Sequence, residues 1–252
     1  MKATKAILTI KSINEFAGNV YRVECESETA LPHIAAGQFA HISVPGKELK
    51  RPICVYRSSE HSITFIIAKV GDGTAAFTAQ RAGAKFDAIL PLGNGFPIMP
   101  DITNVVLLGG GTGCAPLYKI AADNPWLNCT ALLGFPNAAA RDAYADDFDK
   151  VCSKVCYCTD DGSVGYHGYP TELLTEVAPD VMYVCGAPGL MRTAQKFCAD
   201  RGTLGFASIE QRMGCGVGAC LVCAVKIRRN GKIVNARACA DGPVFAIGDI
   251  VM

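Results

Sequence analysis

The sequence has no strong excess of charge of either sign. It contains 24 lysine and arginine residues against 23 aspartate and glutamate residues, which gives a formal net charge of +1 at pH 7. Polyanions such as nucleic acids and anionic membrane surfaces are bound through clustered basic charge. We therefore expect neither nucleic acid nor a membrane among the partners of this chain.

Long apolar runs are also missing. No stretch approaches the ~20 apolar residues that a membrane-spanning helix needs, and residues 1–11 lack the apolar core of a signal peptide. We therefore expect a cytoplasmic protein. Thiols stay reduced in that compartment, so the 13 cysteines are expected to be metal ligands, core residues and a site residue rather than disulfides.

Histidine is scarce and scattered. The four histidines, His33, His41, His61 and His167, show no spacing typical of metal ligands. We expect them at the surface or in turns. Any metal site in this chain should therefore depend on cysteine.

Four cysteines near the end of the sequence have the spacing of a metal centre. Cys215, Cys220 and Cys223 form C-x4-C-x2-C, and Cys239 follows after fifteen intervening residues. This is the plant-type ligand spacing for a [2Fe–2S] cluster. The glycines between these ligands leave the backbone free to wrap a cluster and to point N–H groups at its sulfurs.

Two other interpretations of these cysteines stay open. Structural zinc also takes four thiolates, although usually as symmetrical pairs, and cysteine is in any case common as a buried free thiol. An iron–sulfur centre moves one electron at a time. If the cysteines bind an iron–sulfur cluster, the rest of the chain should supply the electron donor or acceptor of that cluster.

The first part of the chain, residues 1–98, predicts an antiparallel β-barrel. Short apolar or alternating runs are separated by turn residues, which is typical of small antiparallel barrels. The runs lie at 6–10, 20–25, 39–44, 53–56, 62–68 and 87–90. Arg51 and Tyr56 place a phosphate-binding group and an aromatic ring on one strand. Gly73 and Thr74 open an expected helix at 75–82, whose N-terminus offers a second cradle for phosphate.

Residues 99–205 predict a doubly wound α/β domain. Strands expected at 104–108, 131–134, 154–159 and 181–185 alternate with helices at 115–123, 138–150, 169–177 and 189–201. The first strand enters a Gly-Gly-Gly-Thr-Gly turn that can bring N–H groups and a helix N-terminus against a pyrophosphate. The run is not a strict G-x-G-x-x-G, so a plain tight turn is the alternative. Cys185 and Gly186 follow the last strand, at the edge where such sheets bind ligands.

Together these motifs resemble the ferredoxin reductase superfamily over essentially the whole chain. They are Arg-Pro-Ile-Cys at 51–54, Gly-Asp-Gly-Thr at 71–74, Pro-Leu-Gly-Asn-Gly-Phe at 91–96, the glycine turn at 109–113 and Cys-Gly at 185–186. With the cysteine motif, and most specifically with residues 208–224, the chain resembles the electron-transfer subunits of class 1B dihydroorotate dehydrogenases. The resemblance implies an antiparallel β-barrel flavin domain (1–98), a doubly wound α/β nucleotide-binding domain (99–205) and a C-terminal [2Fe–2S] module (206–252).

The resemblance also implies three cofactors. FAD would lie on the barrel, against Arg51, Pro52, Ile53, Cys54, Ile66, Ile67, Ala68, Gly73 and Thr74. NAD(H) would lie over the α/β domain, against Gly109, Gly110, Gly111, Thr112, Gly113, Cys185 and Gly186, with Cys185 near the reacting nicotinamide. The cluster would be held by Cys215, Cys220, Cys223 and Cys239. At Cys54 the chain departs from the family, which usually has serine there.

The implied function is electron transfer in pyrimidine biosynthesis. An FMN-containing catalytic subunit would oxidise dihydroorotate, and this chain would carry the electrons through the cluster and FAD to NAD⁺, in a heterotetramer with two copies of each subunit. A flavin/iron–sulfur subunit of another complex, of the ferredoxin–NADP reductase or sulfide dehydrogenase type, is the alternative enzyme. A zinc-stabilised binding module is the alternative without redox function.

Overall fold

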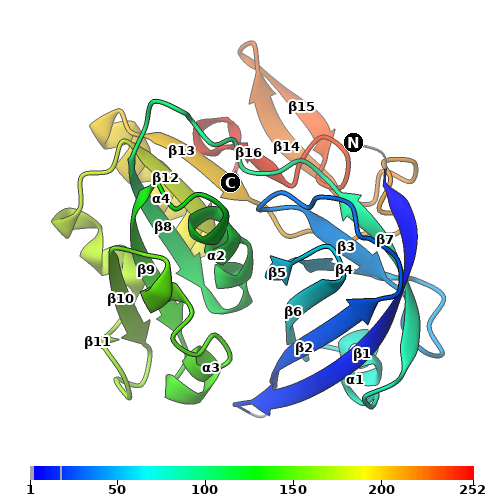
Figure 1. The fold of residues 1–252 in the computed structure, drawn as a ribbon. Helices are drawn as coiled ribbons and strands as arrows, with labels where there is room; N and C mark the ends of the chain where they lie inside the picture. Colours follow the sequence, from blue (N-terminus) through cyan, green and yellow to red (C-terminus); the bar gives the residue numbers. More distant parts are fainter. Residues whose placement is uncertain (1–2, 18) are drawn as a thin grey trace.

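A curled antiparallel sheet forms the first half of the chain (Figure 1). The computed structural model describes residues 3–17 and 19–252. The seven strands, in the spatial order β4-β3-β7-β1-β2-β6-β5, are β1 Thr4–Phe16, β2 Val20–Ser27, β3 Phe39–Ile42, β4 Arg51–Cys54, β5 Arg57–Ser58, β6 Ser62–Ala68 and β7 Lys85–Leu92. The two edge strands, β4 and β5, are joined by only Val55 and Tyr56, which brings the edges of the curled sheet together. The expected antiparallel barrel is therefore confirmed, with β5 as an additional short strand.

The interior of this half is built by the alternation of side chains along its strands. Leu8 and Ile10 of β1, Val23 of β2 and Phe65 of β6 are almost fully buried in one apolar cluster. Alternation of this kind places every second residue on the inner face of a sheet. The short helix α1 (Asp72–Thr78) covers one end of the core through Phe77, which meets Phe86 edge to face at 4.9 Å.

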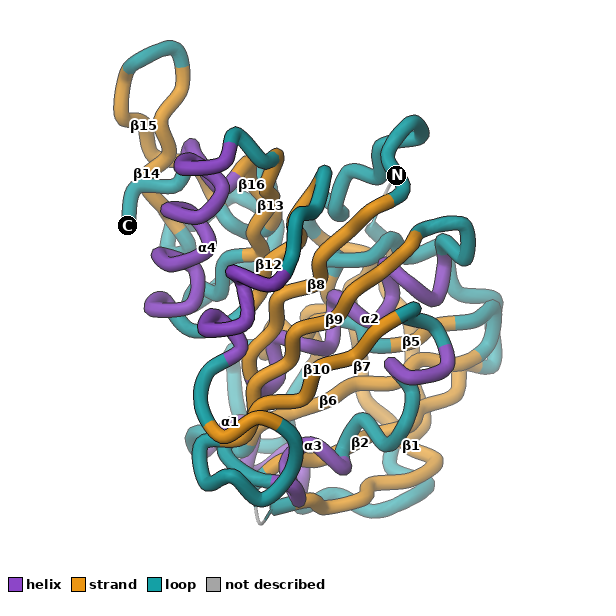
Figure 2. The backbone as a smooth tube through the Cα atoms, turned by 90° about the vertical axis from the view of Figure 1, so that its left-hand side faces the viewer, coloured by secondary structure: helices purple, strands orange, loops and turns teal. Residues whose placement is uncertain are grey.

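The second half is a mostly parallel sheet with helices packed on it (Figure 2). Its order is β11-β10-β9-β8-β12-β13-β16, and only β16 runs antiparallel. The strands are β8 Asn104–Gly110, β9 Asn128–Phe135, β10 Lys154–Thr159, β11 Tyr166–His167, β12 Val181–Cys185, β13 Leu204–Ser208 and β16 Val244–Ala246; the helices are α2 Cys114–Asp123, α3 Ala138–Asp142 and α4 Pro188–Arg201. 3₁₀ segments lie at Gly111–Gly113, Phe148–Lys150, Pro170–Glu176 and Ile247–Asp249. The doubly wound α/β prediction is confirmed.

Two expected helices of this half take other forms. The helix predicted at 138–150 is interrupted, because Ala145 has φ +47°, a left-handed conformation that ends helical hydrogen bonding. The chain then resumes as the 3₁₀ turn Phe148–Lys150. The helix predicted at 169–177 is a 3₁₀ segment, Pro170–Glu176, rather than an α-helix. No helix in residues 3–17 and 19–252 has the length and apolar character needed to cross a membrane.

The cluster module leaves the second sheet and returns to it. β13 extends to Ser208, so the boundary expected between residues 205 and 206 falls inside this strand. β16 then pairs with β13, and the N–H of Ile209 donates to the carbonyl of Pro243 at 2.9 Å. Between them the hairpin of β14 (Ala224–Arg229) and β15 (Lys232–Arg237) projects from the body of the molecule (Figure 2).

The turn of this hairpin matches its sequence. Asn230 and Gly231 connect the strands, with φ +51° and +74°. A two-residue Asn-Gly loop with both residues in the left-handed region is typical of the type I′ turn, whose twist suits a hairpin. The expected hairpin before Cys239 is therefore confirmed.

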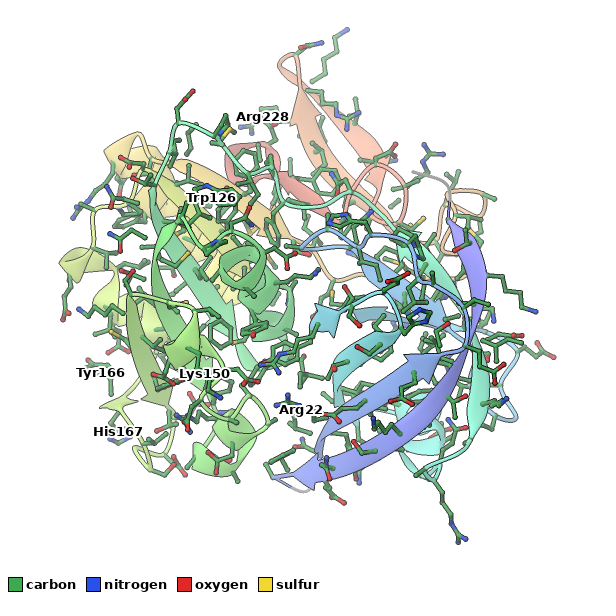
Figure 3. All side chains as sticks on the ribbon, viewed as in Figure 1. Arg22, Trp126, Lys150, Tyr166, His167 and Arg228 are labelled. Atoms are coloured by element: carbon green, nitrogen blue, oxygen red, sulfur yellow. The ribbon has the colours of Figure 1, made fainter. Side chains whose placement is uncertain are left out.

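A buried ion cluster joins the two halves of the chain. The carboxylate of Asp147, from the second half, accepts hydrogen bonds from the Tyr56 hydroxyl at 2.7 Å and from Arg22 at 3.1 Å, and it pairs with Arg57 at 2.5 Å. The Asp147 side chain is 7% exposed. Figure 3 shows Arg22 where the first half faces the segment that carries Lys150. Desolvation opposes ionisation, but the hydrogen bonds from Tyr56 and Arg57 and the charges of both arginines prevail and lower the pKa of Asp147.

Replacement of this carboxylate should loosen the contact between the halves. Asp147→Asn keeps the shape of the side chain but leaves two half-buried guanidinium groups without their counter-charge. We expect a loss of about 3 kcal/mol in the free energy of unfolding at pH 7, the scale for removing one partner of a buried pair. Urea unfolding of both proteins measures this difference.

The neighbouring Asp146→Asn is the matched control, because its side chain is 70% exposed and pairs with Arg141 at the surface. It should change stability little. Since the folded pKa of Asp147 is lowered, its contribution is complete above the ordinary carboxyl pKa of about 4 and disappears as the pH falls through the folded value. A stability difference between wild type and Asp147→Asn that does not shrink in acid would contradict this origin.

Candidate cluster and cofactor sites

The four cysteines of the C-terminal motif come together as two pairs. The backbone N–H of Cys220 donates to the sulfur of Cys215, and the N–H of Cys215 donates to the sulfur of Cys220, both at 3.4 Å. The sulfurs of Cys223 and Cys239 lie 3.2 Å apart. A [2Fe–2S] cluster takes four cysteine sulfurs, shared between two irons. The donor set and its pairing fit such a cluster.

The loop between the pairs supplies further N–H donors. Gly218 donates to the sulfur of Cys239 at 3.1 Å, and Ala219 donates to that of Cys215 at 3.2 Å. Gly216 and Gly218 have φ +70° and +84°, which residues with a side chain rarely adopt. The conformation that aims N–H groups at sulfur therefore depends on glycine at these two positions.

These donors prepare a thiolate. Backbone hydrogen bonds, first from Val217 and then from Cys220, lower the pKa of Cys215 to about 6. Burial, followed by the neighbouring Cys223 thiol, raises the pKa of Cys239 to about 12. A metal cation bound here would lower the pKa of Cys239 as well, because its positive charge would favour the thiolate form of both cysteines.

A single-metal site has a different geometry. Within residues 3–17 and 19–252, no group of three or more histidine, cysteine, aspartate or glutamate side chains is gathered closely enough to hold one ion. The two sulfur pairs instead suit two metals that share four ligands. The arrangement therefore fits the iron–sulfur interpretation.

A cavity of about 290 Å³ lies between the first half and the cluster module. It is lined by the sequence-predicted Arg51, Pro52, Ile53, Cys54, Ile66, Ile67, Ala68, Thr74 and Thr112, together with Phe39, Val70, Ser208, Ile209, Glu210, Gln211, Met213 and Pro243. Its size is close to the lower end of the range for small-molecule sites, about 300–1,000 Å³. The structure thus brings the expected flavin residues other than Gly73 to one place, together with Thr112, which was expected at the nucleotide site.

Gly73 does not line this cavity but packs against Arg51, which does. A Cβ atom at Gly73 would come 2.2 Å from Nε of Arg51. The guanidinium group therefore lies directly on the start of α1, where Nη1 also donates to the carbonyl of Leu49 at 2.6 Å. Glycine at 73 allows Arg51 to reach this position at the wall of the cavity.

The cavity wall is largely apolar, and two acidic groups in it have a raised pKa. Burial raises the pKa of Cys54 to about 12, so its sulfur stays a thiol at pH 7. Desolvation also raises the pKa of Glu210, which lines the cavity and is itself exposed. The sequence motifs of the barrel did not predict Glu210, Gln211 and Met213, but all three lie in the stretch 208–224 that carries the most specific part of the resemblance.

A second cavity, of about 570 Å³, opens at the carboxyl ends of the parallel strands. Its lining residues are Gly110, Gly111, Gly134, Phe135, Pro136, Asp160, Tyr169, Pro170, Thr171, Ala187, Gly189, Leu190 and Thr193. Ligands bind at this edge in open α/β sheets. Gly110 and Gly111 belong to the predicted glycine turn, but no short motif of the sequence singles out the other lining residues.

The glycine turn stands between the two cavities. Gly110 and Gly111 line the second cavity, whereas Thr112 lines the first. Gly113 has a packing role, because a Cβ atom there would come 2.6 Å from the carbonyl oxygen of Cys185. Gly109 is packed in the same way against the sulfur of Cys114, at 2.8 Å from the added Cβ.

Cys185 lies behind this turn and lines neither cavity. It is 1% exposed, and burial raises the pKa of its thiol well above the ordinary value. Gly186 follows it, and its backbone N lies 2.9 Å from a Cβ added at Gly113. The structure therefore places Cys185 and Gly186 against the glycine turn, while a role for Cys185 beside nicotinamide stays a prediction.

Known proteins resemble this chain in sequence. Residues 210–251 match the family described as the iron–sulfur cluster binding domain of dihydroorotate dehydrogenase B. The chain is 33% identical to the "dihydroorotate dehydrogenase B (NAD(+)), electron transfer subunit" of Streptococcus mutans, over 98% of each protein. It is also 33% identical to the protein of the same name from Shouchella clausii, over the full length of both.

Solved structures resemble it in fold. A structure of an NADH-dependent reduced ferredoxin-NADP oxidoreductase, described for flavin-based electron bifurcation, superposes with a TM-score of 0.85 at 26% identity, covering all of this chain and 91% of the other. A ferredoxin NADP+ reductase from Neisseria gonorrhoeae with bound FAD and NADP reaches a TM-score of 0.64 at 16% identity, over 80% of this chain and 93% of that one. The second likeness shows the fold alone.

Sequence identity above 30% along the entire length, together with the match of the cysteine module, identifies the family. The chain belongs to the electron transfer subunits of dihydroorotate dehydrogenase B (NAD(+)).

Proposed function

We propose that this chain passes electrons from an FMN-containing catalytic subunit, which oxidises dihydroorotate, to NAD⁺ in pyrimidine biosynthesis. One observation carries the proposal: the first cavity, lined by the expected flavin residues, is bounded on one side by the cluster module and on the other by the glycine turn of the nucleotide site. Met213 and Thr112 mark these two sides. A site in that position connects one-electron and two-electron chemistry.

Each cofactor has its own residues in this proposal. A [2Fe–2S] cluster is held by Cys215, Cys220, Cys223 and Cys239. FAD lies in the first cavity, against Arg51, Pro52, Ile53, Cys54, Ile66, Ile67, Ala68 and Thr74, with Gly73 below Arg51. NAD(H) lies in the second cavity, on the turn Gly109, Gly110, Gly111, Thr112 and Gly113 and before Cys185 and Gly186.

The order of the sites follows from the chemistry that the groups supply. A nicotinamide exchanges a hydride, an iron–sulfur centre passes single electrons, and a flavin can do both. The protein residues bind and orient these groups: Arg51 offers a positive charge to a phosphate, and the apolar wall around Cys54 excludes water. No side chain has to act as a catalytic base in hydride transfer.

The division into units belongs to the same proposal. Residues 1–98 form the flavin unit, 99–205 the nucleotide unit and 206–252 the cluster module, with β13 and β16 tying the module to the nucleotide sheet. We also propose that the protein works in the cytoplasm.

The partner subunit would dock at the cluster loop. Val217, Leu221 and Val222 are apolar and 55%, 62% and 57% exposed. Apolar side chains gathered on a surface are typical of protein interfaces, and an electron must leave the chain close to the cluster. We propose a heterotetramer with two copies of each subunit.

A second candidate function is that of a flavin and iron–sulfur subunit in another oxidoreductase complex, of the ferredoxin–NADP reductase or sulfide dehydrogenase type. The TM-score of 0.85 to the NADH-dependent ferredoxin-NADP oxidoreductase structure favours it. The two functions share the cofactors and differ in the partner. Identification of the partner therefore distinguishes them.

Anaerobic purification of the native complex tests the favoured function. We expect the chain to co-purify with an FMN-containing subunit, and the complex to form NADH when dihydroorotate and NAD⁺ are added. Flavin and iron–sulfur absorption without this activity would move the chain to another complex. A colourless protein that contains zinc would contradict both functions.

The cluster ligands can be tested by cysteine-to-serine replacement. Cys223→Ser should abolish most of the bound iron and the iron–sulfur absorption, because one iron loses a sulfur ligand. Cys152→Ser is the matched control, since this half-buried thiol lies outside the motif. Iron content that is the same in both variants would argue against Cys223 as a ligand.

The flavin site can be tested at Arg51. Arg51→Ala should weaken FAD binding about 10- to 100-fold, since hydrogen bonds to charged groups contribute about 1.5–3 kcal/mol. Gly73→Ala should also weaken it, because the new Cβ displaces the guanidinium group. The exposed Arg81→Ala is the control. The dissociation constant for FAD, measured on each flavin-free protein, tests this prediction. Equal values for Arg51→Ala and Arg81→Ala would exclude the proposed role of Arg51.

A further inference from the structure

One histidine, His41, is buried where the flavin barrel meets the cluster module. It is 1% exposed, so the expectation that it lies at the surface or in a turn is wrong. Along β3, Ala40 and Ile42 point into the barrel core, whereas Phe39 joins the apolar cluster that contains Cys223. Because side chains alternate along a strand, His41 lies on the same face as Phe39, toward the cluster module.

The ring of His41 lies directly against the segment that carries the first cluster ligand. A Cβ atom added at Gly216 would come 2.5 Å from Nδ1 of His41. Backbone groups of Cys215 and Lys50 flank the ring. A side chain at position 216 is therefore excluded by the imidazole as well as by the left-handed backbone.

His41 is also short of hydrogen-bond partners. Within the described part of the chain, neither Nδ1 nor Nε2 has a partner with hydrogen-bond geometry. Buried polar atoms are normally paired, so a histidine at this position needs an explanation. The apolar packing of the site does not supply one, because an aliphatic side chain would fill the same space without unpaired atoms.

We propose that His41 is a positioning residue for the [2Fe–2S] cluster: its otherwise unpaired imidazole would make a polar contact with the adjacent Cys215–Gly216 backbone when a cluster holds this loop, and would so set the redox potential of the cluster. The proposal rests on the proposed function, since it requires a cluster on this loop. Hydrogen bonding around the sulfur ligands is one of the factors that set the potentials of iron–sulfur centres.

His41 also lies beside the wall of the flavin cavity. His41 lies opposite Pro52 of β4 in the sheet, and Pro52 lines the flavin cavity. The strand that supports the cluster loop therefore also supports the wall of the flavin site. His41 fixes the loop relative to that wall.

Two variants of the complete complex, His41→Leu and His41→Asn, test the proposal. Their side chains have the same branched shape, but only asparagine keeps polar atoms near the place of Nδ1. We expect a more negative midpoint potential and an altered EPR spectrum of the reduced cluster in His41→Leu, and values near those of the wild type in His41→Asn. His33→Leu, at an exposed histidine of the same unit, is the control and should change neither.

The possible outcomes separate clearly. An unchanged potential in His41→Leu, or equal shifts in both variants, would overturn the proposal, because the polar contact would then have no effect of its own. Loss of the cluster from His41→Leu alone supports it, and loss from both variants overturns it. Absence of iron and sulfide from the wild-type complex, measured first, would contradict the proposed function itself.

Discussion

The two cavities are neighbours because the glycine turn packs its backbone directly on the end of β12. Gly113 approaches the carbonyl of Cys185 so closely that no Cβ atom fits between them. This contact leaves the turn thin enough for Thr112 to face one cavity while Gly110 and Gly111 face the other. Ligands in the two cavities would therefore be separated at this point by the backbone of the turn alone.

Charge and shape hold the two halves at a fixed separation around these cavities. Asp147 contacts Arg22, Arg57 and Tyr56 in the ion cluster between the two halves. This ion cluster is distant in sequence from the loop that carries Cys215. On the other side, Asn94 exchanges hydrogen bonds with the backbone of Val244, at 2.8 and 2.9 Å. The flavin half is thus attached to the second half at several places, which also include the hydrogen bond from the Tyr183 hydroxyl to the carbonyl of Pro97 at 2.7 Å.

Local patterns in the sequence were sufficient for much of the fold and for the cluster ligands. The spacing of four cysteines, the Asn-Gly turn at 230–231 and the apolar run before the glycine turn each specify structure within a few residues, and the structure agrees with all three. Contacts between distant segments left no such pattern. Asp147 in the predicted helix 138–150 is indistinguishable by sequence from the neighbouring Asp146, and only the folded chain shows which of them is buried.

His41 shows the same limit at the candidate site. A single histidine among alternating apolar residues has no spacing that indicates a partner, because its neighbour Gly216 is far away in the chain. Apart from Gly110 and Gly111, the residues that line the second cavity come from separate segments of the chain. The sequence could therefore predict a site at this edge of the sheet but not these lining residues. Prediction from sequence succeeds where the determinants are adjacent in the chain, and it fails where tertiary packing selects one residue among similar ones.

The cluster module begins and ends on two paired strands, β13 and β16, closed by the hydrogen bond between Ile209 and Pro243. Paired strands lie only about 4.8 Å apart, so the cluster-bearing segment 209–243 has a narrow base on the nucleotide sheet and is not held on a flexible linker. A tethered carrier domain delivers electrons by swinging between donor and acceptor. The pairing of β13 and β16 instead fixes this segment to the nucleotide sheet, so the distance between a cluster on its loop and the first cavity is set by the fold itself.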